Sequence, residues 1–277
     1  MAEPTDAQEC PTMERRPGPP STLDELRERL VAAGMEALLT NGVAIGLDTV
    51  RVADAIEATG AARATAYRAL ADDELDPQDR LRKEVLLRVL ERDSRAHNVD
   101  VVTGAFTDEF VRLADRAASD DIAERTAAFR SMLRVGGTAA YHNVASSRER
   151  AILTAAYGSE SSKDPDPDGW RHNALAAGEH LVTKQFAEFY SANMALFGNR
   201  LRPGLTLDQF SVAAAALLEG LAMRDRFRDD LDGIVLPTGP DGGDEVWTLY
   251  AAALEGLVWA FFEPDPDSPT AVDVTLR

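Results

Sequence analysis

The sequence contains a single cysteine, Cys10, which lies in an N-terminal segment rich in proline. One cysteine can form no intramolecular disulfide and supplies too few thiolates for a cysteine-rich metal site. The four histidines, His97, His142, His172 and His180, lack metal-ligand spacing, and no HExxH motif, phosphate-binding glycine loop or nucleophile elbow is present. We therefore expect a protein of the reducing cytoplasm that has no metal, no cofactor and no catalytic machinery.

Long hydrophobic runs are also missing. No stretch is long and apolar enough to span a bilayer, and residues 1–20 carry acidic side chains without an apolar run, so we expect neither a membrane anchor nor a secretory signal. Residues 1–20 are polar and Pro-rich, which predicts a disordered tail. The remaining length, with 45% hydrophobic residues overall, has room for one small and one larger folded domain.

Basic residues are scarce, since the formal net charge is −18. An acidic excess repels nucleic acid, so its distribution matters. Residues 21–92 contain ten Lys and Arg against fourteen Asp and Glu, whereas the residues after them contain seventeen against twenty-nine. Within the first of these regions, residues 60–70 contain Arg63 and Arg68 and no acid, and Arg51 lies shortly before them. The pattern predicts a short cationic surface on an acidic protein.

Three helices are predicted after the tail. Thr22 and Glu25 form a capping-box pattern that opens a helix with Leu23, Leu26, Leu30 and Ala33 or Ala37 on one face, and Asn41-Gly42 ends it. A second helix is expected at about 51–59, Gly60 breaks it, and a third short helix then runs to about Leu70. Two short helices joined by a glycine turn predict a helix-turn-helix.

The rest of the chain predicts only helices, because no segment alternates apolar and polar residues as a strand does. Asp76-Pro77 opens the first of them, with Asp as cap and Pro at the first helical position. Thr206 and Gln209 form another capping box. The expected helices are 77–96, 101–118, 121–140, 147–157, 169–198, 206–229 and 244–263, with long loops at 159–168 and 233–243. The predicted fold is all-α, with domains at 21–76 and 77–264 and a C-terminal tail at 265–277.

The segment VRVADAIEATGAARATAYRAL, residues 50–70, resembles the helix-turn-helix signature of the tetracycline-repressor (TetR) family. Ala55-Ile56 match the family's apolar pair, Gly60 its turn, and Thr65-Ala66-Tyr67 the core of its recognition helix. The resemblance implies that Arg51, Arg63, Thr65, Tyr67 and Arg68 contact DNA. Arginines can reach phosphates or guanine edges, and the two hydroxyls can donate to phosphate oxygens.

The sequence departs from that signature at three places. Ala62 stands where the family has a Ser or Thr cap, Leu70 stands where it has an aromatic residue, and the acidic run Asp72-Asp73-Glu74 replaces a basic residue. Loss of the cap is expected to weaken the helix start by about 1 kcal/mol. The acidic run removes a phosphate anchor, so we expect a DNA affinity that is modest, that depends strongly on salt, or that is helped by Arg15 and Arg16 acting as a tail arm.

Two late segments, AALLEGL at 215–221 and AALEGL at 252–257, are similar to the small-residue helices through which the family dimerises. Small residues at helical spacing let helices approach closely, so a four-helix bundle between two copies is expected through 206–229 and 244–263. An intramolecular core is the alternative interpretation.

The resemblance also implies a small-molecule effector bound in the second domain. The candidate lining residues combine apolar bulk with polar tips, although core packing explains each of them as well. They are Phe129, Met132, Tyr141, His142, Trp170, Phe186, Tyr190 and Asn193.

The expected function is therefore a DNA-binding transcriptional regulator, a repressor that a small molecule releases from a palindromic operator. Two alternatives stay open. One is a ligand-sensing or protein-interaction dimer whose degenerate helix-turn-helix binds DNA weakly or not at all, which the net charge favours. The other is a small-molecule enzyme on an all-α scaffold, which the absence of paired catalytic groups disfavours.

Overall fold

The structure is a computed structural model that describes residues 22–41, 47–96, 99–160, 169–237, 243–265 and 267–268. Over these residues the chain is mostly helical, so the predicted all-α class is confirmed at that level. The predicted tail at 1–20 and almost all of the predicted tail at 265–277 lie outside the described residues. The helices are α1 (Leu23–Asn41), η2 (Leu47–Thr49), α2 (Val52–Thr59), α3 (Arg63–Ala69), α4 (Pro77–Ala96), α5 (Val99–Arg112), α6 (Ala114–Ala117), α7 (Ile122–Ser146), α8 (Arg148–Glu160), α9 (Trp170–Leu196), α10 (Leu207–Asp225) and α11 (Leu249–Phe261).

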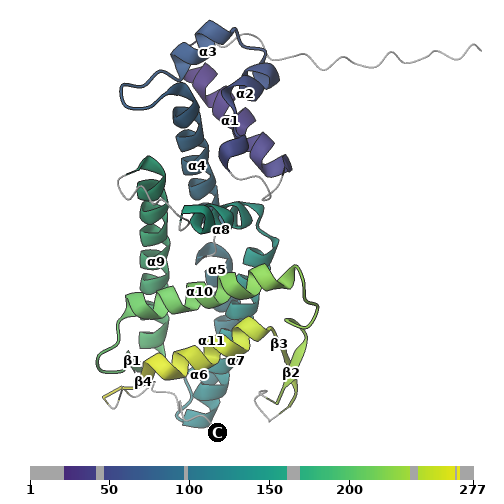
Figure 1. Ribbon diagram of the computed structural model, residues 1–277. Helices are drawn as coiled ribbons and strands as arrows, with labels where there is room; N and C mark the ends of the chain where they lie inside the picture. The colour runs from purple at the N-terminus through teal and green to yellow at the C-terminus, as the bar shows by residue number, and fades with distance from the viewer. Residues whose placement is uncertain are drawn as a thin grey trace, which may run out of the picture.

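Helices α1–α3 form one end of the molecule, and α4 extends from this end toward the body (Figure 1). The helix α8 crosses near the junction, and α5, α6, α7, α9, α10 and α11 make up the body. Four short strands complete the described part. They are β1 (Asn199–Leu201), β2 (Ile234–Leu236), β3 (Glu245–Trp247) and β4 (Phe262–Pro264), paired antiparallel as β1–β4 and β2–β3.

The first helix begins where its capping residues predict. The Thr22 hydroxyl oxygen accepts a hydrogen bond from the backbone N–H of Glu25 at 3.1 Å. Leu26 and Leu30 are buried, as expected, but Leu23 is 47% exposed. The prediction that Leu23 shares the buried face is wrong, because Leu23 is the first residue of α1 and is not part of the hydrophobic cluster that contains Leu26 and Leu30.

Helix α4 also begins as predicted, with Asp76 as its cap. The Asp76 carboxylate accepts hydrogen bonds from the backbone N–H groups of Gln78 and Asp79, at 2.7 and 3.1 Å. Its buried residues Leu81 and Val85 belong to the same hydrophobic cluster as the cores of α1–α3. This cluster continues into α8 and α9, so α4 joins the two ends of the molecule.

The body packs around α7, whose buried face meets α5, α10 and α11. Gly137 allows α7 and α11 to cross closely, because a Cβ there would lie 3.0 Å from the Ala251 Cβ and 3.1 Å from its Cα. A substituted residue at this point would press the two backbones apart. The aromatic side chains of Phe129, Phe197 and Trp259 fill the adjoining core.

Several predicted boundaries are wrong. The expected helix 101–118 divides at Leu113, which has φ −110° and ψ 15°, and the second piece, α6, packs on α7. The expected helix 121–140 continues to Ser146, because Tyr141 and Val144 are also buried. In these cases tertiary packing overrides the local sequence signal.

The expected helix 244–263 begins five residues late. Its first part is β3, which pairs with β2, and Thr248 caps α11 by accepting from the Ala251 N–H at 3.1 Å. Gly233, at φ 73°, turns the chain into β2 within the segment expected to be a loop. Trp247 is only 1% exposed, so burial of this side chain fixes the hairpin against the body.

Candidate functional site

The segment that joins α2 to α3 is a tight glycine turn. Gly60 ends α2 in the left-handed conformation, at φ 65° and ψ 22°, which a residue with a Cβ adopts only at a cost. Arg29 of α1 donates to the Thr59 carbonyl at 2.9 Å and so caps the same helix end. Val52 and Ala55 bury one face of α2, while Arg51, just before it, is exposed.

Helix α3 turns an acid-free face toward solvent. Ala66, Ala69 and Leu70 are buried, whereas the predicted contact residues Arg63, Tyr67 and Arg68 are exposed and Thr65 is half-buried. The Arg63 guanidinium lies 5.5 Å from the centre of the Tyr67 ring. The Arg68 guanidinium donates to the Thr65 hydroxyl at 3.4 Å. The structure thus brings four predicted residues together on one short helix.

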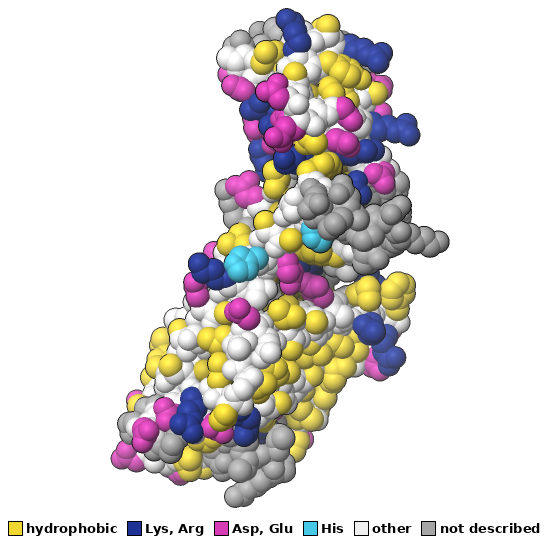
Figure 2. Space-filling model, turned by 60° about the vertical axis from the view of Figure 1, so that its left-hand side comes forward, with side chains coloured by type: hydrophobic (Ala, Val, Ile, Leu, Met, Phe, Trp, Pro, Cys, Tyr) yellow, Lys and Arg dark blue, Asp and Glu magenta, His cyan; other side chains and the backbone are white. Residues whose placement is uncertain are grey.

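Basic side chains are also visible at this end of the whole molecule. Figure 2 shows Lys and Arg side chains projecting from the end that α1–α3 form, with acidic side chains among them. The start of α3 has no side-chain cap at Ala62, as its sequence predicts. The exposed outer face of α3 is therefore cationic, while its N-terminal turn is held only by packing and backbone hydrogen bonds.

The acidic run after α3 is partly engaged within the protein. Asp72 forms an ion pair with Arg80 of α4 and accepts a hydrogen bond from the Glu74 N–H at 2.9 Å. That backbone hydrogen bond, followed by the attraction of Arg80, lowers the pKa of Asp72 below its ordinary value. Asp73 and Glu74 are exposed. Two of the three carboxylates therefore face solvent beside α3.

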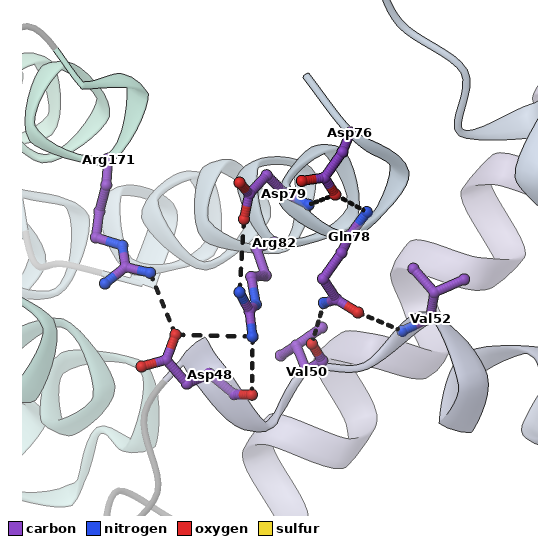
Figure 3. A network of polar contacts seen from close by, with 8 residues as sticks. All are labelled: Asp48, Val50, Val52, Asp76, Gln78, Asp79, Arg82 and Arg171. Atoms are coloured by element: carbon purple, nitrogen blue, oxygen red, sulfur yellow. Dashed lines mark hydrogen bonds and ion pairs between the residues drawn. The ribbon is translucent and has the colours of Figure 1, made fainter.

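A polar network that the sequence did not reveal fixes the start of α2 (Figure 3). The Gln78 amide of α4 donates to the Val50 carbonyl at 2.5 Å, and its oxygen accepts from the Val52 N–H at 3.1 Å. One side chain thus satisfies two backbone groups in the segment that leads into α2. Gln78 is a positioning residue that ties α2 to the first turn of α4.

The same network extends to the body through Asp48 (Figure 3). Arg82 of α4 donates to the Asp48 carbonyl at 3.0 Å, and Arg171, at the start of α9, lies 3.4 Å from the Asp48 carboxylate. Arg82 also lies 3.5 Å from Asp79 in its own helix. The polar contacts therefore join η2, α4 and α9, three elements far apart in sequence.

Four of the eight predicted effector contacts line one pocket in the body. Met132, Phe186, Tyr190 and Asn193 surround a cavity of about 20 Å³, which is large enough for about one water molecule. Burial raises the pKa of Tyr190 to about 12. This pocket is nearly filled by its own side chains.

The other four predicted contacts lie elsewhere. Phe129 packs between aromatic rings of the core, and the Tyr141 hydroxyl donates to Asp225 at 2.6 Å. His142 lies 2.7 Å from Asp232 on the surface, and Trp170 lies at the start of α9. The structure does not bring these residues into the pocket of the first four.

A larger cavity, of about 330 Å³, lies between the end of α7, α8 and the end of α10. Its lining includes Arg150, Glu219 and Arg226, none of which the sequence analysis singled out. These residues are separated by up to 76 positions, and only the packing of three helices brings them together.

Helices α10 and α11 share a face of small and apolar side chains. On α10 this face includes Val212 and Ala216, and on α11 it includes Ala253 and Gly256, all at least partly exposed. Figure 2 shows hydrophobic side chains covering a broad area of the body. No acidic or basic residue interrupts α10 between Gln209 and Glu219, and the Glu255 carboxylate of α11 is paired with Arg130.

Comparison with family models, with curated proteins and with solved structures gave no match to this chain. Among the residues that the structure describes, no group of three or more His, Cys, Asp or Glu side chains could hold a metal ion. No helix in the described ranges is long and apolar enough to cross a membrane. The candidate site is therefore defined by its own residues.

Proposed function

We propose that the chain is a DNA-binding transcriptional regulator in which α2 and α3 form a helix-turn-helix and α3 is the recognition helix. The observation that supports this most is the outer face of α3, where Arg63, Tyr67 and Arg68 are exposed without an acidic neighbour on the helix. On a chain with a net charge of −18, such a face is unusual. Arginine and tyrosine side chains on a short exposed helix suit contacts with phosphates and base edges.

The regulator is proposed to act as a homodimer joined through the apolar faces of α10 and α11. Small residues at the surface of both helices permit close helix packing, and the face contains no charge that would have to be desolvated. A two-fold dimer presents two copies of α3 to successive major grooves about 34–36 Å apart. Its operator is accordingly a near-palindrome.

A small-molecule effector in the helical body is proposed to release the DNA. An effector acts only if it binds one arrangement of the dimer more tightly than the other. Helix α4 and the contact between Arg171 and Asp48 supply a physical connection, since both link the body to the segment before α2. Movement of α4 or α9 would then change the position of α3.

The direct test is selection of bound sequences from a random DNA library, followed by fluorescence anisotropy on the selected site. The double variant Arg63→Ala, Arg68→Ala should weaken binding at least roughly tenfold, because a lost base contact costs about 1–3 kcal/mol. If both arginines contact phosphates, the slope of log affinity against log salt falls by about two. The matched control is Arg200→Ala, Arg228→Ala, which removes the same charge from exposed sites outside α1–α3.

If the Arg63→Ala, Arg68→Ala variant binds the selected site as tightly as the wild type does, α3 is not the recognition helix. If both double variants lose the same affinity relative to the wild type, only net charge matters. A selection that enriches no sequence would reject sequence-specific DNA binding altogether.

A second candidate is a ligand-sensing or protein-interaction dimer whose helix-turn-helix no longer binds DNA. The exposed carboxylates of Asp73 and Glu74, next to α3, favour it, because they repel phosphates. This alternative predicts a flat binding profile on fragments of the protein's own promoter at low salt, together with an intact dimer.

A further inference from the structure

The cavity between α7, α8 and α10 has the size of a small-molecule site. Its volume of about 330 Å³ lies at the lower end of the ~300–1,000 Å³ found for ligand pockets. Most of its wall is apolar and comes from Val144 and Ala145 of α7, Ala151 and Ala155 of α8, and Ala222 of α10. It is far roomier than the 20 Å³ pocket in the centre of the body.

The mouth of the cavity is also apolar. Phe227 is 85% exposed and Met223 is 48% exposed, and both line the cavity at the end of α10. Large apolar side chains at the edge of a hollow mark a place where an apolar molecule can enter and be covered.

Most of the polar groups that line the cavity already have partners. The Ser147 hydroxyl oxygen accepts from the Arg150 N–H at 3.0 Å, and the Thr154 hydroxyl donates to the Arg150 carbonyl at 2.9 Å. The Arg150 guanidinium is paired with Glu219 at 2.8 Å. In contrast, the guanidinium of Arg226 has no hydrogen bond or ion pair with any residue that the structure describes.

We propose that this cavity binds an amphipathic anion, whose acidic head group pairs with Arg226 and whose apolar part fills the space between α7, α8 and α10. At ~30 Å³ for a group the size of a water molecule or methylene, the volume suits roughly eleven heavy atoms. A carboxylate pairs well with an arginine, and the apolar wall favours a hydrocarbon chain or ring. A cationic head group would meet Arg226 as a like charge.

The floor of the cavity connects it to α4. Arg150 is 4% exposed, and its guanidinium also pairs with the buried Asp93 of α4 at 2.8 Å. A molecule in the cavity therefore lies against a pair of ion contacts that joins α8 and α10 to α4. The effector role of this molecule rests on the proposed DNA-binding function. Its binding to the cavity is measured without DNA, so the anion site and the DNA-binding function can fail separately.

The test is isothermal calorimetry of the whole chain with decanoate, decan-1-ol and decyltrimethylammonium. Decanoate should bind at least tenfold more tightly than either of the others. Shortening decanoate to octanoate should weaken binding about fourfold for each methylene removed.

Two variants locate the site. Arg226→Gln should weaken decanoate binding at least tenfold and leave decan-1-ol unchanged, whereas Arg228→Gln, two residues along and paired with Asp230, should change neither. Ala155→Leu narrows the cavity and should weaken both ligands. Far-ultraviolet circular dichroism checks that each variant is folded, which is expected for the two arginine variants because Arg226 and Arg228 are exposed.

The proposal is overturned if decanoate fails to bind at millimolar concentration, or if all three head groups bind equally. It is also overturned if Arg226→Gln behaves like Arg228→Gln. If the wild-type protein does not bind DNA, the proposed function is rejected, but the calorimetric evidence for an anion site in the cavity still holds.

Discussion

Single residues determine how firmly α2 is attached to α4, and Gln78 is the clearest case. Gln78→Ala removes both hydrogen bonds to the Val50 and Val52 backbone, so the free energy of unfolding should fall by about 1–3 kcal/mol. Urea denaturation measures this change. Gln78→Glu keeps an acceptor for the Val52 N–H but sets a carboxylate oxygen against the Val50 carbonyl oxygen, so it should cost at least as much as Gln78→Ala. Equal midpoints for wild type and Gln78→Ala would mean that water replaces the amide without loss.

Glu219 gives stability a pH dependence. Burial raises the pKa of Glu219 above its ordinary value of 4.5, against the opposing attraction of Arg150. The folded chain therefore holds this proton at pH values where the unfolded chain has lost it. Its contribution to the free energy of unfolding should fall as pH rises above about 4.5 and become constant above the folded-state pKa.

The measurement is the difference in unfolding free energy between wild type and Glu219→Gln across this pH range. As pH rises, the free energy of unfolding of the wild type should fall relative to that of Glu219→Gln. Glu188→Gln, at an exposed position of α9, is the control and should give a flat difference. A flat difference for Glu219→Gln as well would show that Arg150 offsets the cost of burial.

At the scale of single residues, the sequence predicts those conformations and exposures that depend only on neighbouring residues. Gly60 adopts the expected left-handed turn, and Arg63 and Arg68 are exposed on the predicted short helix. Gln78 and Arg226 gave no signal, because their roles depend on segments that lie far away in the sequence. Four of the eight predicted effector contacts line the central pocket and four lie elsewhere, since apolar residues with polar tips occur both in cores and in pockets.

At the scale of elements, capping residues predict helix starts well. Thr22, Asp76 and Thr206 each accept the expected backbone hydrogen bonds at the starts of α1, α4 and α10. The ends of α1, α2 and α4 were also predicted, whereas several helix ends in the body and the short strands were missed, because Leu113 and Trp247 are buried in the folded chain. Local pattern does not contain that information.

Helix α7 contains two adjacent glycines, Gly136 and Gly137, and the crossing of α7 and α11 depends on Gly137. Gly137→Ala should lower the free energy of unfolding by about 1–3 kcal/mol, because the new Cβ meets the Ala251 backbone at 3.1 Å. Gly136→Ala is the matched control, since its Cβ would lie 3.7 Å from the nearest side chains and the helix gains up to about 1 kcal/mol. Thermal unfolding compares the two. Similar melting temperatures would show that the helices separate at little cost.

At the scale of the whole molecule, charge is arranged unevenly. Acidic residues dominate the chain, yet α3 has none and the face of α10 and α11 is apolar. The first arrangement suits an approach to phosphates by one end of the molecule, and the second suits contact with another apolar surface. Both surfaces could be predicted from the sequence, because each is a run of local composition on consecutive helical turns. The domain boundary at residue 76 stays a prediction, since α4 packs with both ends.

The proposed dimer can be tested with two glycines that differ only in position. Gly256 on α11 and Gly104 on α5 are both exposed, helical, and open to a Cβ without any atom within 4 Å. Each can therefore accept an arginine within its own chain. Gly256→Arg places a charge and a long side chain in the apolar face, so it should raise the dimer dissociation constant at least a hundredfold, or about 2.7 kcal/mol. Gly104→Arg should leave the dimer unchanged. Sedimentation velocity across a concentration series measures both, and a Gly256→Arg dimer as stable as the Gly104→Arg dimer would place the interface away from α11.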